Sequence, residues 1–355
     1  MKKGNDLFMK KMDVEREVTT KADAPCAVFF TEGGHNSGLG HIARCVALSR
    51  AFGKKGITSK IIVDGDSSVD GLLSEVSFVR KDWIGSRVEV FGIIKKTDVV
   101  VVDSYRADRS FYTDVSGLCR LVVCFDDNMR LDYPEGTVVN GSMGAETLGY
   151  DKKPGTEYLL GVKYMCLRPE FESVPEWRTR ADVKSILITF GGNDIRGLTS
   201  IVLSSLVRRF PNVTKKVIIG PATRSEDSFF VKNLDNTEMI FAPSASKIRD
   251  VMCGVDMAVT AGGQTLYELA RVGVPAVVVG VADNQLGNIA GWEKAGAIKY
   301  SGFWDAPDIE RRIISDCGSL LVKGIREEMS SKGRCLMDGE GAERVVNKVF
   351  SKVKV

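Results

Sequence analysis

The sequence contains very little histidine, and its cysteines form no recognisable set. Only two of the 355 residues are histidines, His35 and His41, and both fall within or at the end of one predicted loop. The eight cysteines include no Cys-x-x-Cys pair. Without a histidine cluster or a paired-cysteine motif, neither a zinc site nor a disulfide framework is indicated. We therefore expect a reduced, cytoplasmic protein with no metal ion and no cofactor.

Long apolar runs and a charge excess of one sign are also missing. No apolar run approaches the ~20 residues of a membrane-spanning helix, and the charged segment 1–24 lacks the apolar core of a secretory signal. The net charge is only +3, with basic and acidic residues interspersed, whereas a nucleic-acid-binding surface needs a clustered basic stripe. We expect no membrane insertion, no nucleic-acid partner and a monomer.

The length and the repeated pattern fit two globular domains. A chain of 355 residues with 44% hydrophobic residues is long enough for two domains. The order strand, glycine-rich loop, helix occurs twice, once from Cys26 and again from Ser185, which predicts two wound α/β units. The expected parts are a charged tail over 1–24, an N-terminal domain over 25–172, a linker over 173–182, a C-terminal domain over 183–335, and a C-terminal helix over 336–355 that can cross back to the N-terminal domain.

The first unit places a histidine at a helix start. A buried strand is predicted over 27–31, a glycine-rich loop over 32–40, and a helix that His41 opens. A helix N-terminus disfavours the imidazolium form, so a neutral ring at the carboxyl end of a strand can act as a general base. The alternative is a capping histidine that bonds only the backbone. The glycine spacing does not match a dinucleotide fingerprint.

Two apolar strands of the same unit end in polar residues. Such runs are typical of strands buried on both faces of a parallel sheet, and their carboxyl ends fall on the rim that carries His41. Asp103 and Tyr105, after the strand over 99–102, are candidate site residues. Asp126 and Asp127, after the strand over 121–125, either bind substrate or cap the following turn.

The second unit contains a glycine turn that suits an anion. Gly262 and Gly263 follow a short strand over 256–260 and let the backbone turn tightly. Gln264 and Thr265 then open a helix, whose unpaired N–H groups and dipole favour negative charge. Glu268, one turn into the helix, can accept hydrogen bonds from the hydroxyl pair of a sugar. The alternative is that the two glycines form only a turn.

Two more polar loops lie at carboxyl ends of predicted strands. Asn284 and Gln285 follow the strand over 276–281, and Gly191, Gly192 and Asn193 follow the strand over 185–190. Open α/β sheets bind their ligands at this end. These loops and the glycine turn together predict a site between the two units for a phosphorylated, hydroxyl-bearing ligand, most simply a nucleotide.

Six short motifs, taken in order, resemble a known family. They are Gly-Leu-Gly-His-Ile-Ala-Arg-Cys (38–45), Val-Asp-Ser-Tyr (102–105), Phe-Asp-Asp (125–127), Phe-Gly-Gly-Asn-Asp (190–194), Gly-Gly-Gln-Thr-Leu-Tyr-Glu (262–268) and Asn-Gln (284–285). The set resembles the hydrolase of pseudaminic acid biosynthesis that acts on UDP-2,4-diacetamido-2,4,6-trideoxy-β-L-altropyranose, and the spore-coat polysaccharide proteins. The resemblance implies the GT-B fold, an α/β architecture in which two Rossmann-like, doubly wound domains face a central cleft.

The resemblance also implies a role for individual residues. UDP is expected in the C-terminal domain and the sugar in the N-terminal domain, with His41 as the catalytic histidine, Tyr105 near the sugar, and Glu268 on the ribose. Hydrolysis of a UDP-sugar to UDP and the free diacetamido sugar, with inversion, is the implied reaction. A GT-B glycosyltransferase and a non-catalytic nucleotide-sugar-binding protein are the alternatives. The expected sugar-binding residues are Gly40, Asp103, Tyr105, Asn284 and Gln285, and the expected UDP-binding residues are Gly191, Gly192, Asn193, Gly262, Gly263, Gln264, Thr265 and Glu268.

Overall fold

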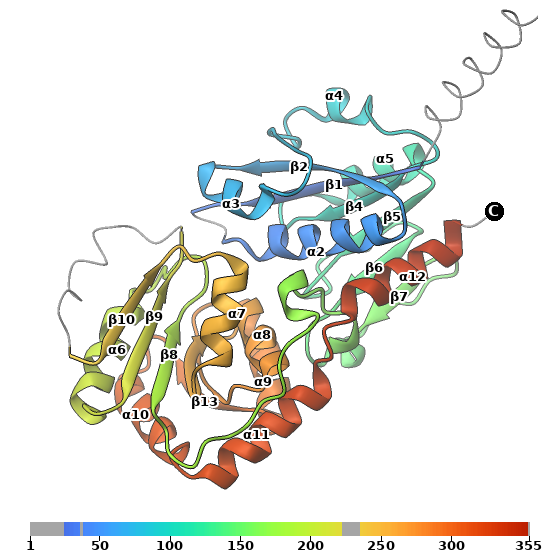
Figure 1. The fold of residues 1–355 in the computed structure, drawn as a ribbon. Helices are drawn as coiled ribbons and strands as arrows, with labels where there is room; N and C mark the ends of the chain where they lie inside the picture. Colours follow the sequence, from blue (N-terminus) through green and yellow to red (C-terminus); the bar gives the residue numbers. More distant parts are fainter. Residues whose placement is uncertain (1–24, 36–37, 222–234, 354–355) are drawn as a thin grey trace, which may run out of the picture.

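The computed structural model describes residues 25–35, 38–221 and 235–353, which form two lobes (Figure 1). The predicted tail over 1–24 lies outside the described residues. Each lobe is built around one parallel sheet, with helices on both faces. The repeated strand, loop, helix pattern is therefore present once in each lobe.

The N-terminal lobe holds a seven-stranded sheet in the order β3-β2-β1-β4-β5-β6-β7, and every neighbouring pair is parallel. Its strands are β1 (Cys26–Gly33), β2 (Thr58–Gly65), β3 (Phe78–Arg80), β4 (Val99–Asp103), β5 (Leu121–Phe125), β6 (Thr137–Asn140) and β7 (Glu157–Leu160). Its helices are α2 (Gly40–Lys54), α3 (Asp70–Leu73), α4 (Arg87–Phe91) and α5 (Arg109–Leu118). The four valines of β4 are all buried, as expected of a central strand that is covered on both faces.

The C-terminal lobe holds a six-stranded parallel sheet in the order β10-β9-β8-β11-β12-β13. Its strands are β8 (Ser185–Thr189), β9 (Thr214–Ile219), β10 (Thr237–Phe241), β11 (Met257–Ala261), β12 (Ala276–Gly280) and β13 (Ile298–Phe303). Its helices are α6 (Leu198–Arg209), α7 (Ala245–Cys253), α8 (Gln264–Val272), α9 (Leu286–Lys294), α10 (Ile309–Ser319) and α11 (Lys323–Leu336).

Two strands have no clear signal in the sequence. The segment after Trp292 is mainly helical, and it also contains β13, an edge strand next to β12. The loop-rich segment over 141–163 contains β7, which pairs with β6. Both strands sit in the outer part of a sheet, where a strand is short or half exposed and lacks the continuous apolar run that reveals a central strand.

The final helix, α12 (Gly341–Val353), belongs to the core of the N-terminal lobe although it follows the C-terminal lobe in sequence (Figure 1). Val345, Val346 and Val349 are fully buried in the cluster that α2 forms with one face of the first sheet. The chain therefore passes between the lobes twice. The two passages touch, since a Cβ placed on Gly341 would lie 2.1 Å from the carbonyl oxygen of Met165.

Candidate functional site

His41 is paired with a carboxylate at the carboxyl edge of the first sheet. The ring lies in the first turn of α2, and Asp103 is the last residue of β4. His41 Nδ1 lies 2.6 Å from Asp103 Oδ1, and both side chains are buried. An ionised carboxylate only accepts hydrogen bonds, so Nδ1 carries the hydrogen and donates it. Nε2 is then left with a lone pair, which is the form that a general base needs.

Arg44 binds the same carboxylate and a second one. It follows His41 by three positions on α2 and therefore lies on the same helix face. Its Nε and Nη2 donate to Asp103 at 2.5 and 2.7 Å, and its Nη1 and Nη2 donate to Asp127 at 2.6 and 2.9 Å. Nη2 is also 3.0 Å from His41 Nδ1. Both of its hydrogens already have carboxylate acceptors, so this contact does not change the tautomer.

Burial and charge act in opposite directions on these groups. Burial alone raises the pKa of the Asp103 and Asp127 carboxyls, but the charge of Arg44 and the hydrogen bonds outweigh it, so both pKa values lie below the ordinary range. Burial lowers the pKa of Arg44, and the two carboxylates more than compensate, raising it well above its usual value. Asp103, Asp127 and Arg44 are thus all charged at neutral pH.

The charges of this cluster leave an excess of one negative charge. Two carboxylates, Asp103 and Asp127, surround one guanidinium, that of Arg44. When the His41 ring is neutral, the cluster carries a net charge of −1, and a proton on the ring brings the charge to zero.

Tyr105 covers the ring from the exposed side. Its ring meets the ring of His41 edge-on, with centroids 4.6 Å apart at 87°, and its hydroxyl donates to Asp127 Oδ2 at 2.7 Å. Burial, and next the neighbouring carboxylate of Asp127, raise the pKa of the Tyr105 hydroxyl, so the group stays a neutral donor. The residue is 41% exposed, which leaves it available to a ligand.

In the C-terminal lobe, the two adjacent glycines of the turn before α8 have different surroundings. A Cβ on Gly262 would come within 2.5 Å of the buried Ile289 side chain, so packing requires glycine there. A Cβ on Gly263 would meet nothing nearer than 3.9 Å, where it would approach Gln285 Nε2. Gly263 is the N-cap residue of α8 and has an ordinary φ of −89°. The space beside Gly263 is therefore open to a ligand.

The first turns of α2 and α8 lie against each other, although they belong to different lobes. A Cβ on Gly40 would lie 3.5 Å from Gln264 Oε1, and a Cβ on Gly192 would lie 3.1 Å from the Leu39 side chain. Asn193 Nδ2 donates to the His35 carbonyl oxygen across the same boundary. The structure thus brings the histidine helix and the glycine turn together, with the 191–193 loop beside both.

Three of the predicted site residues have contacts that the sequence does not reveal. Asp103 is expected to contact the sugar, but it is fully buried and both of its oxygens are held by His41 and Arg44. Glu268 is 2% exposed and forms an ion pair with Arg168. Gln285 Oε1 accepts from the Val281 N–H at 3.2 Å. These bonds make Asp103 a positioning residue.

The remaining predicted site residues lie in or next to the loops that follow the strands. Asn284 is exposed at the edge of α9 within a short 3-10 turn. Thr265 Oγ1 would lie 4.0 Å from a Cβ on Gly191, so these two predicted residues face each other. Asp126 caps its own turn, because its Oδ1 accepts from the N–H groups of residues 128 and 130, whereas Asp127 belongs to the histidine cluster.

Sequence reasoning missed two arginines, Arg44 and Arg168. The helical spacing from His41 could have pointed to Arg44, since residues i and i+3 share a face. Arg168 has no such signal, because it lies in the passage between the lobes and meets Glu268 across 100 positions of sequence.

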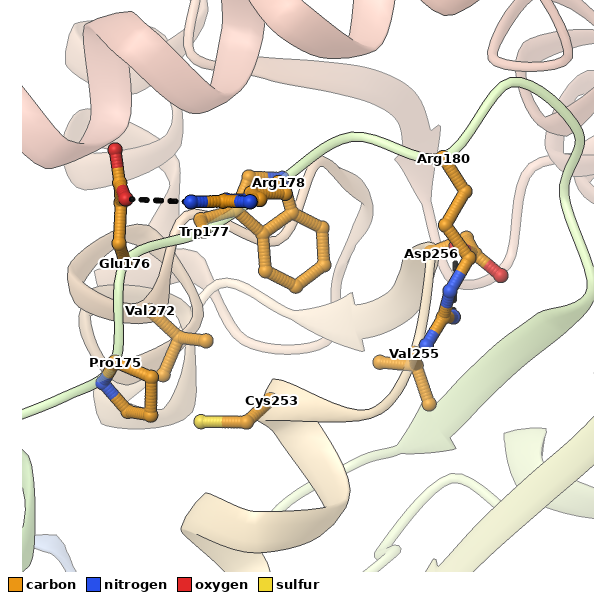
Figure 2. Close-up of a pocket in the computed structure, with 9 residues that line it drawn as sticks. All are labelled: Pro175, Glu176, Trp177, Arg178, Arg180, Cys253, Val255, Asp256 and Val272. Carbon is orange, nitrogen blue, oxygen red and sulfur yellow. Dashed lines mark hydrogen bonds and ion pairs between the residues drawn. The ribbon is translucent and has the colours of Figure 1, made fainter.

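A cavity of about 280 Å³ lies apart from this cluster, under the segment that leads into the C-terminal lobe. Figure 2 shows the Trp177 ring over it, with Cys253 below and the Arg180–Asp256 ion pair at one side. None of the predicted site residues lines this cavity.

Among the described residues, no helix combines the length and the apolar content that a membrane span requires.

Comparisons with known structures agree on the fold. MurG of Acinetobacter baumannii superposes with a TM-score of 0.61 at 14% identity, covering 92% of this chain and 100% of that chain. MnaA of S. aureus, solved with UDP, superposes with a TM-score of 0.66 at 14% identity, covering 93% and 98%. The expected fold class is confirmed: the chain has the GT-B fold, with two Rossmann-like domains.

Curated proteins match over most of the chain. SpsG, a spore coat polysaccharide biosynthesis protein of Bacillus subtilis, is 22% identical over 331 residues, which are 89% of this chain and 95% of its own. A Helicobacter pylori protein is 24% identical over 281 residues, 78% of this chain. It is named a pseudaminic acid cytidylyltransferase and UDP-2,4-diacetamido-2,4,6-trideoxy-beta-L-altropyranose hydrolase. The uncharacterized protein MJ1062 of Methanocaldococcus jannaschii is 28% identical over 264 residues, 70% of this chain.

The chain spans about half the length of two of these relatives, 54% of MJ1062 and 47% of the H. pylori protein. No model of a protein family matches the chain. Within the GT-B fold, the chain is similar to SpsG and to the H. pylori protein, the resemblance that the motifs indicated.

Proposed function

We propose that the protein is a UDP-sugar hydrolase that releases UDP and a free 2,4-diacetamido-2,4,6-trideoxyhexose, in nonulosonic acid biosynthesis. The observation that carries the proposal is the His41–Asp103 pair and its place in the fold. The helix that holds His41, α2, starts against the glycine turn of the other lobe. A base and an anion-binding helix start thus face the same small region, as the hydrolysis of a sugar diphosphate requires.

In the proposed reaction, His41 Nε2 takes a proton from water while the water oxygen attacks the anomeric carbon. Asp103 holds the Nδ1 hydrogen and keeps Nε2 free to accept. As the ring becomes an imidazolium, the excess negative charge of Asp103 and Asp127 is neutralised. Direct attack by water breaks the bond to the diphosphate oxygen from the opposite side, so the configuration at the anomeric carbon inverts.

The leaving group needs no protein acid. UDP departs as an anion whose charge is spread over two phosphates, which distinguishes this reaction from ordinary glycoside hydrolysis with its two carboxyl groups. The N–H groups around Gly263, Gln264 and Thr265 would stabilise that charge at the start of α8. One well-placed donor of this kind contributes about 3–4 kcal/mol to transition-state stabilisation.

The choice of substrate is supported by the relatives and by the exposed residues of the cluster. The H. pylori relative is named for hydrolysis of a UDP-diacetamido sugar, and MnaA was solved with UDP. Tyr105 offers a hydroxyl beside His41, and Asn284 offers an exposed amide in the turn before α9. Acetamido groups carry both a donor and an acceptor, so these two side chains suit their recognition.

A glycosyltransferase is the second candidate, because the same fold serves proteins such as MurG and the UGT2 of Phytolacca americana. Its acceptor would occupy the place of the attacking water beside His41. A non-catalytic nucleotide-sugar-binding protein would bind through the same turn, but it has no use for a histidine held in one tautomer by a buried carboxylate.

Incubation of the protein with UDP-diacetamido sugars in the absence of an acceptor tests these candidates. NMR of the anomeric proton follows the sugar, and His41→Asn serves as the variant. Hydrolysis predicts stoichiometric UDP and free sugar with inverted configuration, and the variant should keep UDP binding and lose most of its turnover. Release only after an acceptor is added would favour transfer, and binding without turnover would favour the non-catalytic protein.

A further inference from the structure

Three exposed side chains with large apolar parts lie at the edge of the first sheet that carries His41. Tyr105, Met129 and Leu148 are 41%, 43% and 38% exposed, and they lie in the loops that follow β4, β5 and β6. These strands are neighbours in a parallel sheet, so the loops after them leave from one edge. Exposed apolar side chains gathered at one place commonly mark a binding surface.

Met129 has a backbone conformation that a side chain of its type rarely adopts. Its φ is +56°, in the left-handed region where glycine and asparagine are the usual residues. Either of these would fit this position with less strain. Strained residues occur mainly where a functional side chain must be held in one place. The conformation therefore favours a role for the methionine side chain itself.

The loop around Met129 is fixed by its neighbours, so the strain has no easy release. Asp126 Oδ1 accepts from the N–H groups of Asn128 and Arg130, each at 3.2 Å. The Arg130 guanidinium donates to the Ser104 carbonyl oxygen at 3.0 Å, which ties this loop to the loop after β4. The two loops therefore form one rigid border.

The same loop carries a member of the histidine cluster. Asp127 Oδ2 accepts from the Tyr105 hydroxyl at 2.7 Å, and the ring of Tyr105 meets the ring of His41 with centroids 4.6 Å apart. Met129 follows Asp127 by two positions and is exposed. Its thioether thus belongs to the border of the region in which the proposed function places the sugar.

We propose that Met129, together with Tyr105 and Leu148, forms an apolar border that recognises the methyl groups of the sugar. This inference rests on the proposed function, whose sugar carries three methyl groups, one on each acetamido group and one at C6, and a single ring hydroxyl. Such a sugar is less polar than an ordinary hexose. The methionine side chain is flexible and polarizable, which suits contact with methyl groups of irregular arrangement.

Two substitutions of Met129 test the proposal. Met129→Asn removes the apolar contact and suits the left-handed backbone, so its melting temperature should be at least that of the wild type. Met129→Leu keeps an apolar side chain of similar volume and should keep the wild-type preference. Leu321→Asn is the matched control, because Leu321 is also 43% exposed but lies between α10 and α11 in the other lobe.

The measurement compares kcat/KM for the UDP-2,4-diacetamido-2,4,6-trideoxyhexose with that for two analogues. One analogue has formyl groups in place of both acetyl groups, and the other has a hydroxyl on C6. We expect the wild type to prefer the substrate over at least one analogue by about 10-fold or more, and Met129→Asn to reduce this preference below about 3-fold. The analogue concerned identifies which methyl groups the border contacts.

The affinity for UDP alone, measured by calorimetric titration, should stay the same in Met129→Asn, because the border contacts only the sugar. A preference that this variant leaves at the wild-type value overturns the proposal, as does a wild type that hydrolyses all three compounds equally well. A loss of preference in Leu321→Asn, or a lower melting temperature of Met129→Asn, also contradicts it. Absence of hydrolysis of all three compounds by the wild type would overturn the proposed function, and this inference with it.

Discussion

Asp103 Oδ1 accepts a hydrogen bond from His41 Nδ1 at 2.6 Å, although 62 positions of sequence separate the two residues. The contact exists because β4 pairs with β1, and the loop after β1 leads directly into α2. The carboxyl end of β4 and the first turn of α2 therefore meet at one edge of the sheet. The sheet order thus gives the histidine an orienting partner, with Arg44 as the counter-charge for that partner.

Asp103→Asn should reduce turnover strongly and leave nucleotide binding intact. The amide can present a hydrogen to Nδ1, which would move the ring hydrogen to Nε2 and abolish the base. Loss of the orienting carboxylate in comparable histidine pairs costs about 10⁴-fold in kcat, and we expect a decrease of about 10²–10⁴-fold here. Steady-state kinetics with the UDP-sugar and UDP titration separate the two effects.

The matched control for Asp103→Asn is Asp132→Asn, at an exposed carboxylate that is paired with Lys153 and Arg109, outside the cluster of His41, Arg44, Asp103 and Asp127. This variant should keep the wild-type kcat. An equal loss of UDP affinity and of turnover in Asp103→Asn would show that the carboxylate supports the fold of the site and not the tautomer of His41.

The low pKa values of the Asp103 and Asp127 carboxyls make stability depend on acid pH. In the folded protein both pKa values lie below the ordinary value, so near and below about pH 4 the unfolded chain binds more protons than the folded chain. Stability therefore rises with pH in this window. It is fully present above the ordinary pKa and is lost as the pH falls through the folded value.

Asp127→Asn should reduce this acid sensitivity, because one of the two shifted groups is removed. The free energy of unfolding of the wild type should fall more steeply, by up to about 1.4 kcal/mol per pH unit for the one proton involved. Urea unfolding at several pH values below the ordinary carboxyl pKa measures both slopes. Parallel slopes would mean that Asp127 has an ordinary pKa and that Arg44 does not hold its charge.

The central parts of both sheets were predictable from sequence because their strands are continuous apolar runs. The strand over 121–125 was predicted with the bounds that β5 has, and the strand over 99–102 differs from β4 by only its last residue. The outer strands β7 and β13 were missed. Their four and six residues are partly exposed, so tertiary pairing and not periodicity defines them.

The candidate site was predictable where the chemistry lies in a local motif, and not where it arises from pairing over long distances. His41 and the glycine turn are recognisable because a helix start follows each loop directly. The bonds of Asp103 to Arg44 and of Glu268 to Arg168 join residues 59 and 100 positions apart. Such pairs depend on the sheet order and on the path between the lobes, which periodicity does not encode.

Val346→Ala in α12 should destabilise the N-terminal lobe, although the helix follows the C-terminal lobe in sequence. The side chain is fully buried against the α2 side of the first sheet, so its truncation leaves a cavity that costs about 1–3 kcal/mol. Urea unfolding measures the loss. Asn347→Ala, at the exposed neighbouring position, should change stability by less than about 0.5 kcal/mol; equal losses would contradict the packing of α12.

The two glycines of the turn before α8 offer a test that separates folding from binding. Gly262→Ala places its methyl group within 2.5 Å of Ile289 in the core, so we expect a loss of stability of about 1–3 kcal/mol from overpacking. Gly263→Ala has its nearest neighbour at 3.9 Å and an ordinary φ of −89°. It should therefore fold with a stability within about 0.5 kcal/mol of the wild type.

If a diphosphate lies against the start of α8, the added methyl group of Gly263→Ala occupies space that the ligand needs. We expect its UDP affinity to fall by about 10-fold or more, which corresponds to ~1.4 kcal/mol, while thermal unfolding stays close to that of the wild type. Calorimetric titration with UDP and a melting curve on the same preparation measure both quantities. An unchanged UDP affinity in a folded Gly263→Ala would place the diphosphate elsewhere and remove the anion site from the proposed mechanism, because the added methyl group lies where that mechanism puts the ligand.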